Sequence, residues 1–292
     1  MSDVILKMEG ITKVFGGVVA LENARFELKA GEVHALIGEN GAGKSTLMKV
    51  LLGMHKRDGG TILYQDKEIE FSSPSEALNN GISMIHQEVN LVHKMSVAEN
   101  IWLGREDLFT NRLGMIRNAK RMEMTRELLG SLEIDIPPEA LVESLSIAQM
   151  QLVEIARAVS YEPRIIIMDE PTSALTDQEV EKLYRIIRGL TAKQVSVIFI
   201  SHKLEELFRI CDRVTVMRDG HFIAAYGIGE VTQDELIRMI SGREDKNLFV
   251  KQQAKPGKVM LEVRDLSNGN SCRGVNLTVR QGEVVGLCGL MG

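Results

Sequence analysis

The sequence predicts an α/β protein with a mostly parallel β-sheet covered by helices, an antiparallel β edge and an inserted α-helical subdomain. Apolar runs rich in β-branched residues alternate along the chain with segments of helical period, which is the pattern of such a sheet. A stretch of about residues 88–160 breaks this alternation and reads as helices, and it is the expected insertion.

Apolar runs mark the strands of the expected sheet. They are Val33 to Ile37, Arg164 to Met168, Val195 to Ile200 and Arg213 to Met217. The last run is followed by Asp219 and Gly220, a hairpin turn signal. The sheet should therefore turn antiparallel at this edge.

Helices are predicted from spacing and from capping residues. A crossover helix follows the second run, with apolar residues at helical spacing at Val180, Leu183, Tyr184 and Ile187. Ser96 with Glu99 and Thr232 with Glu235 have the spacing of capping boxes, in which two residues satisfy free N–H groups at a helix start. Helices should begin at both places.

The chain is expected to contain one complete domain and the beginning of a second. Residues 251–258 are polar with Pro and Gly, and they are the predicted linker between residues 1–250 and 259–292. Beyond it, residues 282–292 align without gaps on residues 31–41. An internal repeat explains this likeness, so the second copy should be a truncated start of the first.

Composition narrows the function classes. The 292 residues carry a formal net charge of −5 and are 44% hydrophobic, which is typical of a soluble globular protein. Proteins that hold nucleic acid mainly through phosphates need clustered Lys and Arg, so no nucleic-acid partner is expected. No apolar stretch is long enough to cross a bilayer and no signal peptide begins the chain, so we expect it to stay in the cytosol. The three cysteines are expected to be structural thiols.

Residues 38–45, GENGAGKS, match the phosphate-loop pattern between an apolar strand and a helix. Glycines let the backbone wrap a polyphosphate, the helix N-terminus directs N–H groups at it, and Lys44 supplies positive charge near the β and γ phosphates. The Ser45 hydroxyl is expected on Mg²⁺. The residues predicted to bind nucleotide here are Gly38, Glu39, Asn40, Gly41, Ala42, Gly43, Lys44, Ser45 and Thr46.

Polar residues follow three further strands at the edge where an α/β sheet presents ligand groups. Asp169 is expected to hold Mg²⁺, and Glu170 to be the general base for water that attacks the γ phosphate. His202 follows the next strand and is expected to contact the γ phosphate, while Gln87 could complete the magnesium shell. The structural alternatives are that Glu170 caps a turn and that His202 fills an ordinary structural role.

Taken in order, these motifs resemble the ATP-binding cassette (ABC) ATPases, which have the P-loop NTPase (RecA-like) fold. The likeness covers residues 4–245 and includes the Leu145-Ser146 helix start, "IIIMDE" and "SALT". It implies that ATP and Mg²⁺ are bound and that Phe15 stacks on adenine. It also implies that Ser146, otherwise a natural N-cap, reaches the γ phosphate held by an opposite cassette. Within the family, "QEVNL", "SVAEN" and "ISHKLEEL" resemble subunits of bacterial monosaccharide importers of the ribose and galactose type.

One motif departs from the family pattern Leu-Ser-Gly-Gly-Gln, because Ile147 and Ala148 stand where both glycines belong. Side chains there prevent the close approach that glycine allows, so the signature of this first cassette should be poor. The resemblance then implies one degenerate site and one active site, the latter built from Lys44, Asp169, Glu170 and His202 with a signature from a second cassette.

The resemblance implies an ATPase that powers sugar import from the cytoplasmic side of the inner membrane. Its expected partners are membrane permease subunits, a second ATP-binding cassette and, indirectly, a solute-binding protein. The expected permease contact lies near residues 87–104, although that surface could be an ordinary solvated face. The alternatives are a soluble two-cassette ATPase acting on ribosomes or DNA, and an inactive truncated remnant.

Overall fold

The computed structural model describes residues 4–110, 116–242, 256–269 and 272–288. The chain divides into two compact units, residues 1–243 and 244–292. Most of the predicted linker lies outside the described residues.

The predicted sheet is present in unit 1, with the strand order β10-β9-β3-β8-β7-β6. Its members are β3 (Val33–Ile37), β6 (Ile82–Ile85), β7 (Ile165–Asp169), β8 (Ser196–Ile200), β9 (Arg213–Arg218) and β10 (His221–Gly227). Neighbouring strands from β9 to β6 are parallel, and β10 pairs with β9 antiparallel. The fold class and the antiparallel edge predicted from the sequence are confirmed.

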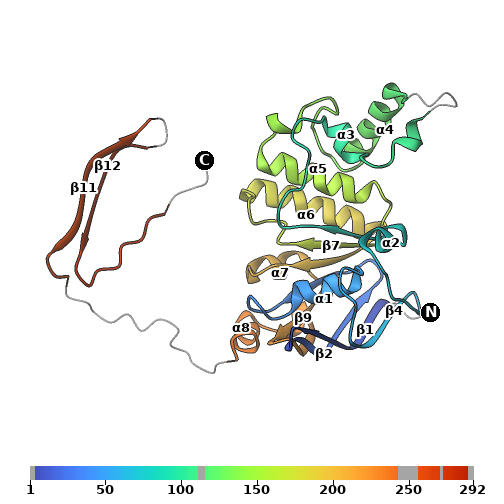
Figure 1. Ribbon diagram of the computed structural model, residues 1–292, viewed down its shortest axis with the longest axis horizontal. Coiled ribbons are helices and arrows are strands. Elements are labelled where there is room, and N and C mark those ends of the chain that lie inside the picture. Colours follow the sequence, from blue (N-terminus) through green and yellow to red (C-terminus); the bar gives the residue numbers. More distant parts are fainter. Residues whose placement is uncertain (1–3, 111–115, 243–255, 270–271, 289–292) are drawn as a thin grey trace. The chain divides into compact units, whose positions relative to one another are not determined.

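Helices cover the central sheet on two sides (Figure 1). They are α1 (Lys44–Leu51), α2 (Pro74–Asn79), α6 (Asp177–Ala192), α7 (Leu204–Ile210) and α8 (Gln233–Ser241), with a 3₁₀ turn at Ile228–Glu230. The predicted crossover helix is α6, and its four predicted apolar residues are buried. The capping box of Thr232 and Glu235 begins α8 as expected.

A second sheet, which the sequence analysis did not predict, lies against the first. It is antiparallel, with the order β2-β1-β4-β5, and comprises β1 (Val4–Phe15), β2 (Val18–Lys29), β4 (Gly59–Tyr64) and β5 (Lys67–Glu68). Its core faces α1 and one side of the central sheet. Ile165 and Ile167 of β7 join this core, whereas Ile166 and Met168 join the core on the helical side. Alternate residues of a strand point to opposite faces, so one buried strand serves both cores.

The inserted segment folds as the expected helical subdomain. It contains α3 (Val97–Ile101), α4 (Asn118–Ser131) and α5 (Ile147–Val159), with 3₁₀ turns at Glu106–Phe109 and Val142–Ser144. The capping box of Ser96 and Glu99 begins α3 as predicted. The helices α3 and α4 lie at the end of unit 1 opposite β1, β2 and β4 (Figure 1).

The described part of unit 2 is a hairpin of β11 (Val259–Asn268) and β12 (Cys272–Arg280). Its two strands pair antiparallel, as β1 and β2 do, and the internal repeat stays a prediction. Residues 284–288, which align with β3, form no strand. In unit 1 the strand β3 is held between β8 and β9, and the described residues of unit 2 include no counterpart of either.

Candidate functional site

The phosphate loop joins β3 to α1 through backbone that excludes side chains at two places. A Cβ at Gly38 would lie 2.2 Å from the carbonyl oxygen of Met217. Gly43, the N-cap of α1, has φ of 95°, and a Cβ there would lie 2.7 Å from Cδ2 of Leu21. Both positions therefore require glycine, and the loop is packed against the protein beneath it.

The Lys44 side chain folds back over this loop. Its Nζ donates to the carbonyl oxygens of Gly38, at 2.8 Å, and Glu39, at 3.0 Å. Burial lowers the pKa of the Lys44 ammonium, while the nearby charges of Asp169 and Glu170 act in the opposite direction. The ammonium is thus held in advance at the place where a polyphosphate would lie.

The loop opens into a cavity of about 540 Å³. Of the predicted site residues, the cavity brings together those of the loop, the helix start and two strand ends. They are Asn40, Gly41, Ala42, Gly43, Lys44, Ser45, Thr46, Gln87, Asp169 and Glu170. Gly38 and Glu39 are not among the lining residues, although their carbonyl groups accept hydrogen bonds from Lys44.

Asp169 is the last residue of β7, and Glu170 directly follows it. Burial raises the pKa of the Asp169 carboxyl above its usual range, and the charge of Glu170 raises it further; Lys44 offsets only part of this. Two carboxylates at one strand end are therefore short of positive charge. A bound divalent cation would supply what is missing.

The donor set fits Mg²⁺. The Ser45 hydroxyl, the Asp169 carboxylate and the Gln87 amide all line the cavity, and oxygen ligands are those that Mg²⁺ prefers. Across the described part of the chain, no cluster of three His, Cys, Asp or Glu side chains is present. A nucleotide-dependent Mg²⁺ site does not need one, since it uses one or two carboxylates with phosphates and waters.

Asp169→Asn is expected to stabilise the nucleotide-free protein at neutral pH while weakening Mg²⁺-dependent nucleotide binding about tenfold or more. Because the folded protein raises the pKa of Asp169, ionisation of this carboxyl destabilises the fold, and the uncharged amide removes that penalty. The gain in the free energy of unfolding should shrink as the pH falls through the raised pKa of Asp169, and it should vanish below the ordinary pKa of Asp, about 3.9, where this carboxyl is protonated in both the folded and the unfolded protein.

Urea unfolding at several pH values measures this gain. Asp135→Asn, at an exposed position, is the matched control. A variant less stable than the wild type at pH 7 would contradict the expectation.

Glu170 lies between two other predicted site residues. Its Oε2 accepts a hydrogen bond from Nε2 of Gln87 at 3.0 Å, and its Oε1 is 3.1 Å from Nδ1 of His202. Glu170 has φ of 48°, in the left-handed region that costs a non-glycine residue about 1 kcal/mol or more. The carboxylate therefore bonds to Gln87 and His202, and the role of Glu170 as general base stays a prediction.

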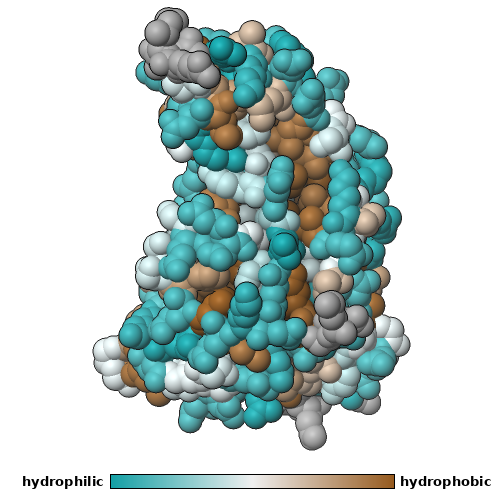
Figure 2. Space-filling view, turned by 90° about the vertical axis from the view of Figure 1, so that its right-hand side faces the viewer, coloured by the Kyte–Doolittle hydropathy of each residue, from teal (hydrophilic) through white to brown (hydrophobic). Residues whose placement is uncertain are grey.

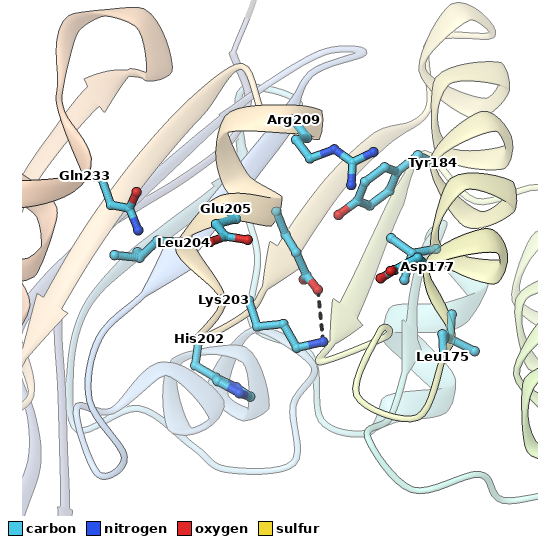
Figure 3. A pocket seen from close by; sticks show the side chains of 11 residues that line it. Leu175, Asp177, Tyr184, His202, Lys203, Leu204, Glu205, Arg209 and Gln233 are labelled. Atoms are coloured by element: carbon cyan, nitrogen blue, oxygen red, sulfur yellow. Dashed lines mark ion pairs between the residues drawn. The ribbon is translucent and has the colours of Figure 1, made fainter. Parts of the chain in front are cut away.

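His202 lines a neighbouring cavity of about 520 Å³ (Figure 3). It is not among the residues that line the cavity at the phosphate loop. Its side chain is 62% exposed, and Glu170 engages its Nδ1. The other ring nitrogen, Nε2, is therefore the atom that remains for a phosphate. The expected γ-phosphate contact stays a prediction.

Phe15 and Ser146 lie outside both cavities as lined by the described residues. Phe15 is 39% exposed, and its ring meets the His55 ring edge-on with the ring centroids 5.0 Å apart. Ser146 is the N-cap of α5, where its Oγ accepts from the Gln149 N–H and its own N–H donates to the Gln149 side chain. The capping role is confirmed, and the roles in stacking on adenine and in contacting an opposite cassette stay predictions.

Sequence reasoning missed several lining residues, namely Val18, Val19, Ala20, Ile200, Asp219 and Gly220. The Gly220 N–H donates to the carbonyl of Ala42 at 3.2 Å, and the Gly220 carbonyl accepts from Glu22 N–H at 3.0 Å. The β9–β10 turn therefore supports the phosphate loop. Asp219-Gly220 was recognisable as a turn, but its position beside the loop depends on the pairing of β3 with β9.

Comparison with known protein sequences points to a family with such a site. The ABC transporter family profile matches residues 21–173, just over half of the chain. A galactose/methyl galactoside import ATP-binding protein of Photobacterium profundum is 49% identical, over 100% of this chain and 59% of that protein. Its Escherichia coli K12 counterpart is 48% identical, over 99% of this chain and 57% of that protein. The chain thus spans a little over half the length of these curated relatives.

Solved structures support the same assignment. A nucleotide-free ATP-binding cassette from an ABC transporter superposes with a TM-score of 0.70 at 28% identity, covering 82% of this chain and 96% of that one. A dimeric cassette bound to ADP and phosphate gives 0.65 at 25% identity, covering 76% and 98%. Fold, site and sequence identity agree, and the chain belongs to the ABC transporter family.

Proposed function

We propose that this chain is an ATP-hydrolysing subunit that powers the import of a sugar through a membrane transporter. The observation that carries the proposal is the single cavity in which the phosphate loop, Lys44, Ser45, Asp169 and Glu170 face one another. The proposal that the imported solute is a sugar rests on the relatives, which are named as galactose/methyl galactoside import ATP-binding proteins.

Each of these groups has a chemical role in this proposal. Lys44 and the loop N–H groups bind the β and γ phosphates, and Ser45 and Asp169 hold Mg²⁺, with Gln87 completing its shell. The bound Mg²⁺ supplies positive charge that neutralises the phosphate oxygens. Glu170 accepts the proton of the attacking water, and its bonds to Gln87 and His202 fix where that carboxylate points.

A groove on unit 1 is the proposed contact for a permease. It has a volume of about 300 Å³ and is mostly apolar, with Leu52, Met54, Leu78, Met84, Leu103 and Tyr161 among its lining residues. Figure 2, which views the molecule from the side of α2, shows hydrophobic surface exposed in a band between hydrophilic regions. An amphipathic helix of a permease would bury its apolar face in such a groove.

The groove and the cavity share one segment of chain. His86 lines the groove, and its neighbour Gln87 donates to Glu170 in the cavity. Helix α5 holds the same segment, because the Glu154 carboxylate accepts from the Asn90 N–H at 3.0 Å and Arg157 donates to the Asn90 carbonyl at 3.0 Å. Movement of a helix in the groove would therefore reach Glu170 through this segment.

No helix within the described ranges is both long and apolar enough to cross a membrane. We place the chain at the cytoplasmic face of the inner membrane, bound to permease subunits, with a solute-binding protein acting indirectly and no nucleic acid involved. The domains proposed are a cassette at residues 1–250, a linker at 251–258 and the start of a second cassette at 259–292.

A second cassette would complete the site. Ser146 caps α5 at the surface, where Ile147 beside it is 56% exposed. A signature helix that contacts the γ phosphate of an opposite cassette needs such an exposed start. The side chain of Ile147 stands where glycine would permit close approach, so the proposed first signature is weak.

The proposal is tested by the Mg²⁺-dependent ATPase rate of this chain over a range of protein concentrations, with Glu170→Gln as the blank. A rate above the blank that rises faster than linearly with concentration would support hydrolysis by paired first cassettes. ATP binding with no such rate would mean that turnover requires another cassette's signature. Absence of both binding and turnover would overturn the proposal.

His202→Ala is expected to slow ATP turnover about tenfold or more while changing ATP binding less than about threefold. The variant removes the ring that engages Glu170 Oε1, but it leaves Lys44 and the loop intact. Steady-state rates together with an equilibrium binding titration separate the two effects. His93→Ala, at an exposed position, is the control, and an unchanged rate for His202→Ala would return this histidine to a structural role.

A further inference from the structure

The loops that carry Glu170 and His202 follow two adjacent strands. In the parallel pair of β7 and β8, Asp169 is opposite Ile200. The Glu170 N–H donates to the Ile200 carbonyl at 2.9 Å, one residue beyond the end of β7. This bond fixes the backbone of the proposed base relative to the residue that precedes the Ser201-His202 pair.

The conformation of Glu170 needs support from its surroundings. A glutamate with φ of 48° is held in a sparsely populated region, and such residues persist only where other contacts over-determine them. The bonds of its side chain to Gln87 and His202 involve two exposed partners. The support must therefore also come from beneath the loops.

A buried carboxylate lies beneath both loops. Glu206, in α7, is only 7% exposed. Its Oε2 accepts from the hydroxyl of Thr172 at 2.9 Å and from the hydroxyl of Ser201 at 2.9 Å. Thr172 is two residues beyond Glu170 and Ser201 is one residue before His202, and both are nearly fully buried. One carboxylate thus joins the two loops.

Lys203 closes this network from the solvent side. Its ammonium pairs with Oε1 of Glu206 at 3.2 Å, shown as a dashed line beside His202 in Figure 3, and it also donates to the carbonyl of Thr172 at 3.4 Å. The Lys203 N–H donates to Oγ of Ser201 at 3.1 Å. Hydrogen bonds between buried groups are strengthened by the low local dielectric, so the two hydroxyl bonds of Glu206 can hold the two loops at a fixed separation.

We propose that Glu206 is a positioning residue of the nucleotide site: its carboxylate holds the Glu170 loop against the His202 loop, and so places the base and the histidine relative to each other. This inference rests on the proposed ATPase function for its consequence in turnover. The arrangement itself stands on the bonds of Glu206 to Thr172 and Ser201.

The test compares Glu206→Ala, Glu206→Gln and the control Glu205→Ala in the full chain. Glutamine keeps an oxygen that can accept both hydroxyl bonds and loses only the charge paired with Lys203, whereas alanine leaves both hydroxyls without their acceptor. Glu205 is the neighbouring acid of the same helix, and it is exposed. The Glu205→Ala variant therefore measures the effect of losing an acidic side chain of α7 that does not bond to Thr172 or Ser201.

The first measurement is amide hydrogen exchange by NMR, which needs no turnover. Glu206→Ala should speed exchange at the Glu170 N–H at least about tenfold more than at Ile198, in the middle of β8. Glu206→Gln should stay within about threefold of the wild type, and Glu205→Ala should match it. Equal acceleration at Glu170 and Ile198 would reveal loss of global stability alone, and no acceleration would show that the loops do not need Glu206; either result overturns the proposal.

The second measurement is ATPase kinetics in the same variants. Glu206→Ala should lower kcat at least about tenfold with KM for ATP changed less than about twofold, and Glu206→Gln should recover most of kcat. A loss confined to KM, or no recovery with glutamine, would overturn the positioning role. If the wild type itself shows no Mg²⁺-dependent turnover, the proposed function fails, and hydrogen exchange still decides whether Glu206 joins the loops.

Discussion

Replacing Glu170 with Gln is expected to lower ATP turnover at least about a hundredfold while ATP binding stays within about threefold or becomes tighter. A general base contributes about 10²–10⁴-fold to such a reaction, and an amide cannot accept the proton of the attacking water. Binding should survive because the loop and Lys44 are unchanged, and because one negative charge near the triphosphate has been removed.

The glutamine should also keep the geometry of the site. Its carbonyl oxygen can accept from Nε2 of Gln87, as Oε2 of Glu170 does. Its amide nitrogen can donate to Nδ1 of His202 if the imidazole adopts the tautomer with the proton on Nε2. The variant therefore isolates proton transfer from placement.

Single-turnover hydrolysis together with an equilibrium titration of labelled ATP measures the two effects. Glu88→Gln, at the exposed position that follows Gln87, is the control, and it should hydrolyse ATP as the wild type does. Hydrolysis by Glu170→Gln at the wild-type rate would remove Glu170 from the mechanism. Loss of ATP binding would instead mean that Glu170 shapes the cavity.

The strands of the central sheet were predictable because burial on both faces leaves a direct mark on the sequence. Every residue of β3 and β8 is buried, and each strand is apolar apart from one residue, His34 in β3 and Ser196 in β8. The phosphate loop was equally predictable, because the clashes at Gly38 and Gly43 permit few other residues. Local constraints of this kind can be read without knowledge of the fold.

The arrangement around Glu170 was only partly predictable. The strand ends placed Asp169, Glu170 and His202 at one edge of the sheet, but nothing in the sequence indicated that Nδ1 of His202 would engage Glu170 instead of facing the phosphate cavity. The turn at Asp219-Gly220 supports the phosphate loop, and the buried Glu206 joins the loops that follow β7 and β8. Both contacts depend on the order of strands that are far apart in the sequence. A residue's partners across a sheet follow from topology, which spacing along the chain does not reveal.

The charges that line the cavity explain why ATP binding should depend strongly on Lys44. Among the described residues that line it, Lys44 is the sole cation and stands against the carboxylates of Asp169, Glu170 and Asp219. Without Lys44 a triphosphate would enter a site with negative charge alone. The two carbonyls that hold the ammonium, those of Gly38 and Glu39, would also lose their donor.

Lys44→Ala is therefore expected to weaken ATP binding about a hundredfold or more and to leave no measurable turnover. A hydrogen bond to a charged group contributes about 1.5–3 kcal/mol, and two such bonds to phosphates at 1.4 kcal/mol per tenfold give that factor. An equilibrium titration with ATP and Mg²⁺ measures the loss, and Lys56→Ala, at an exposed lysine, should bind as the wild type does. Urea unfolding checks that the Lys44 variant is folded. A folded variant that binds ATP as tightly as the wild type would show that the loop N–H groups and Mg²⁺ hold the phosphates without this ammonium.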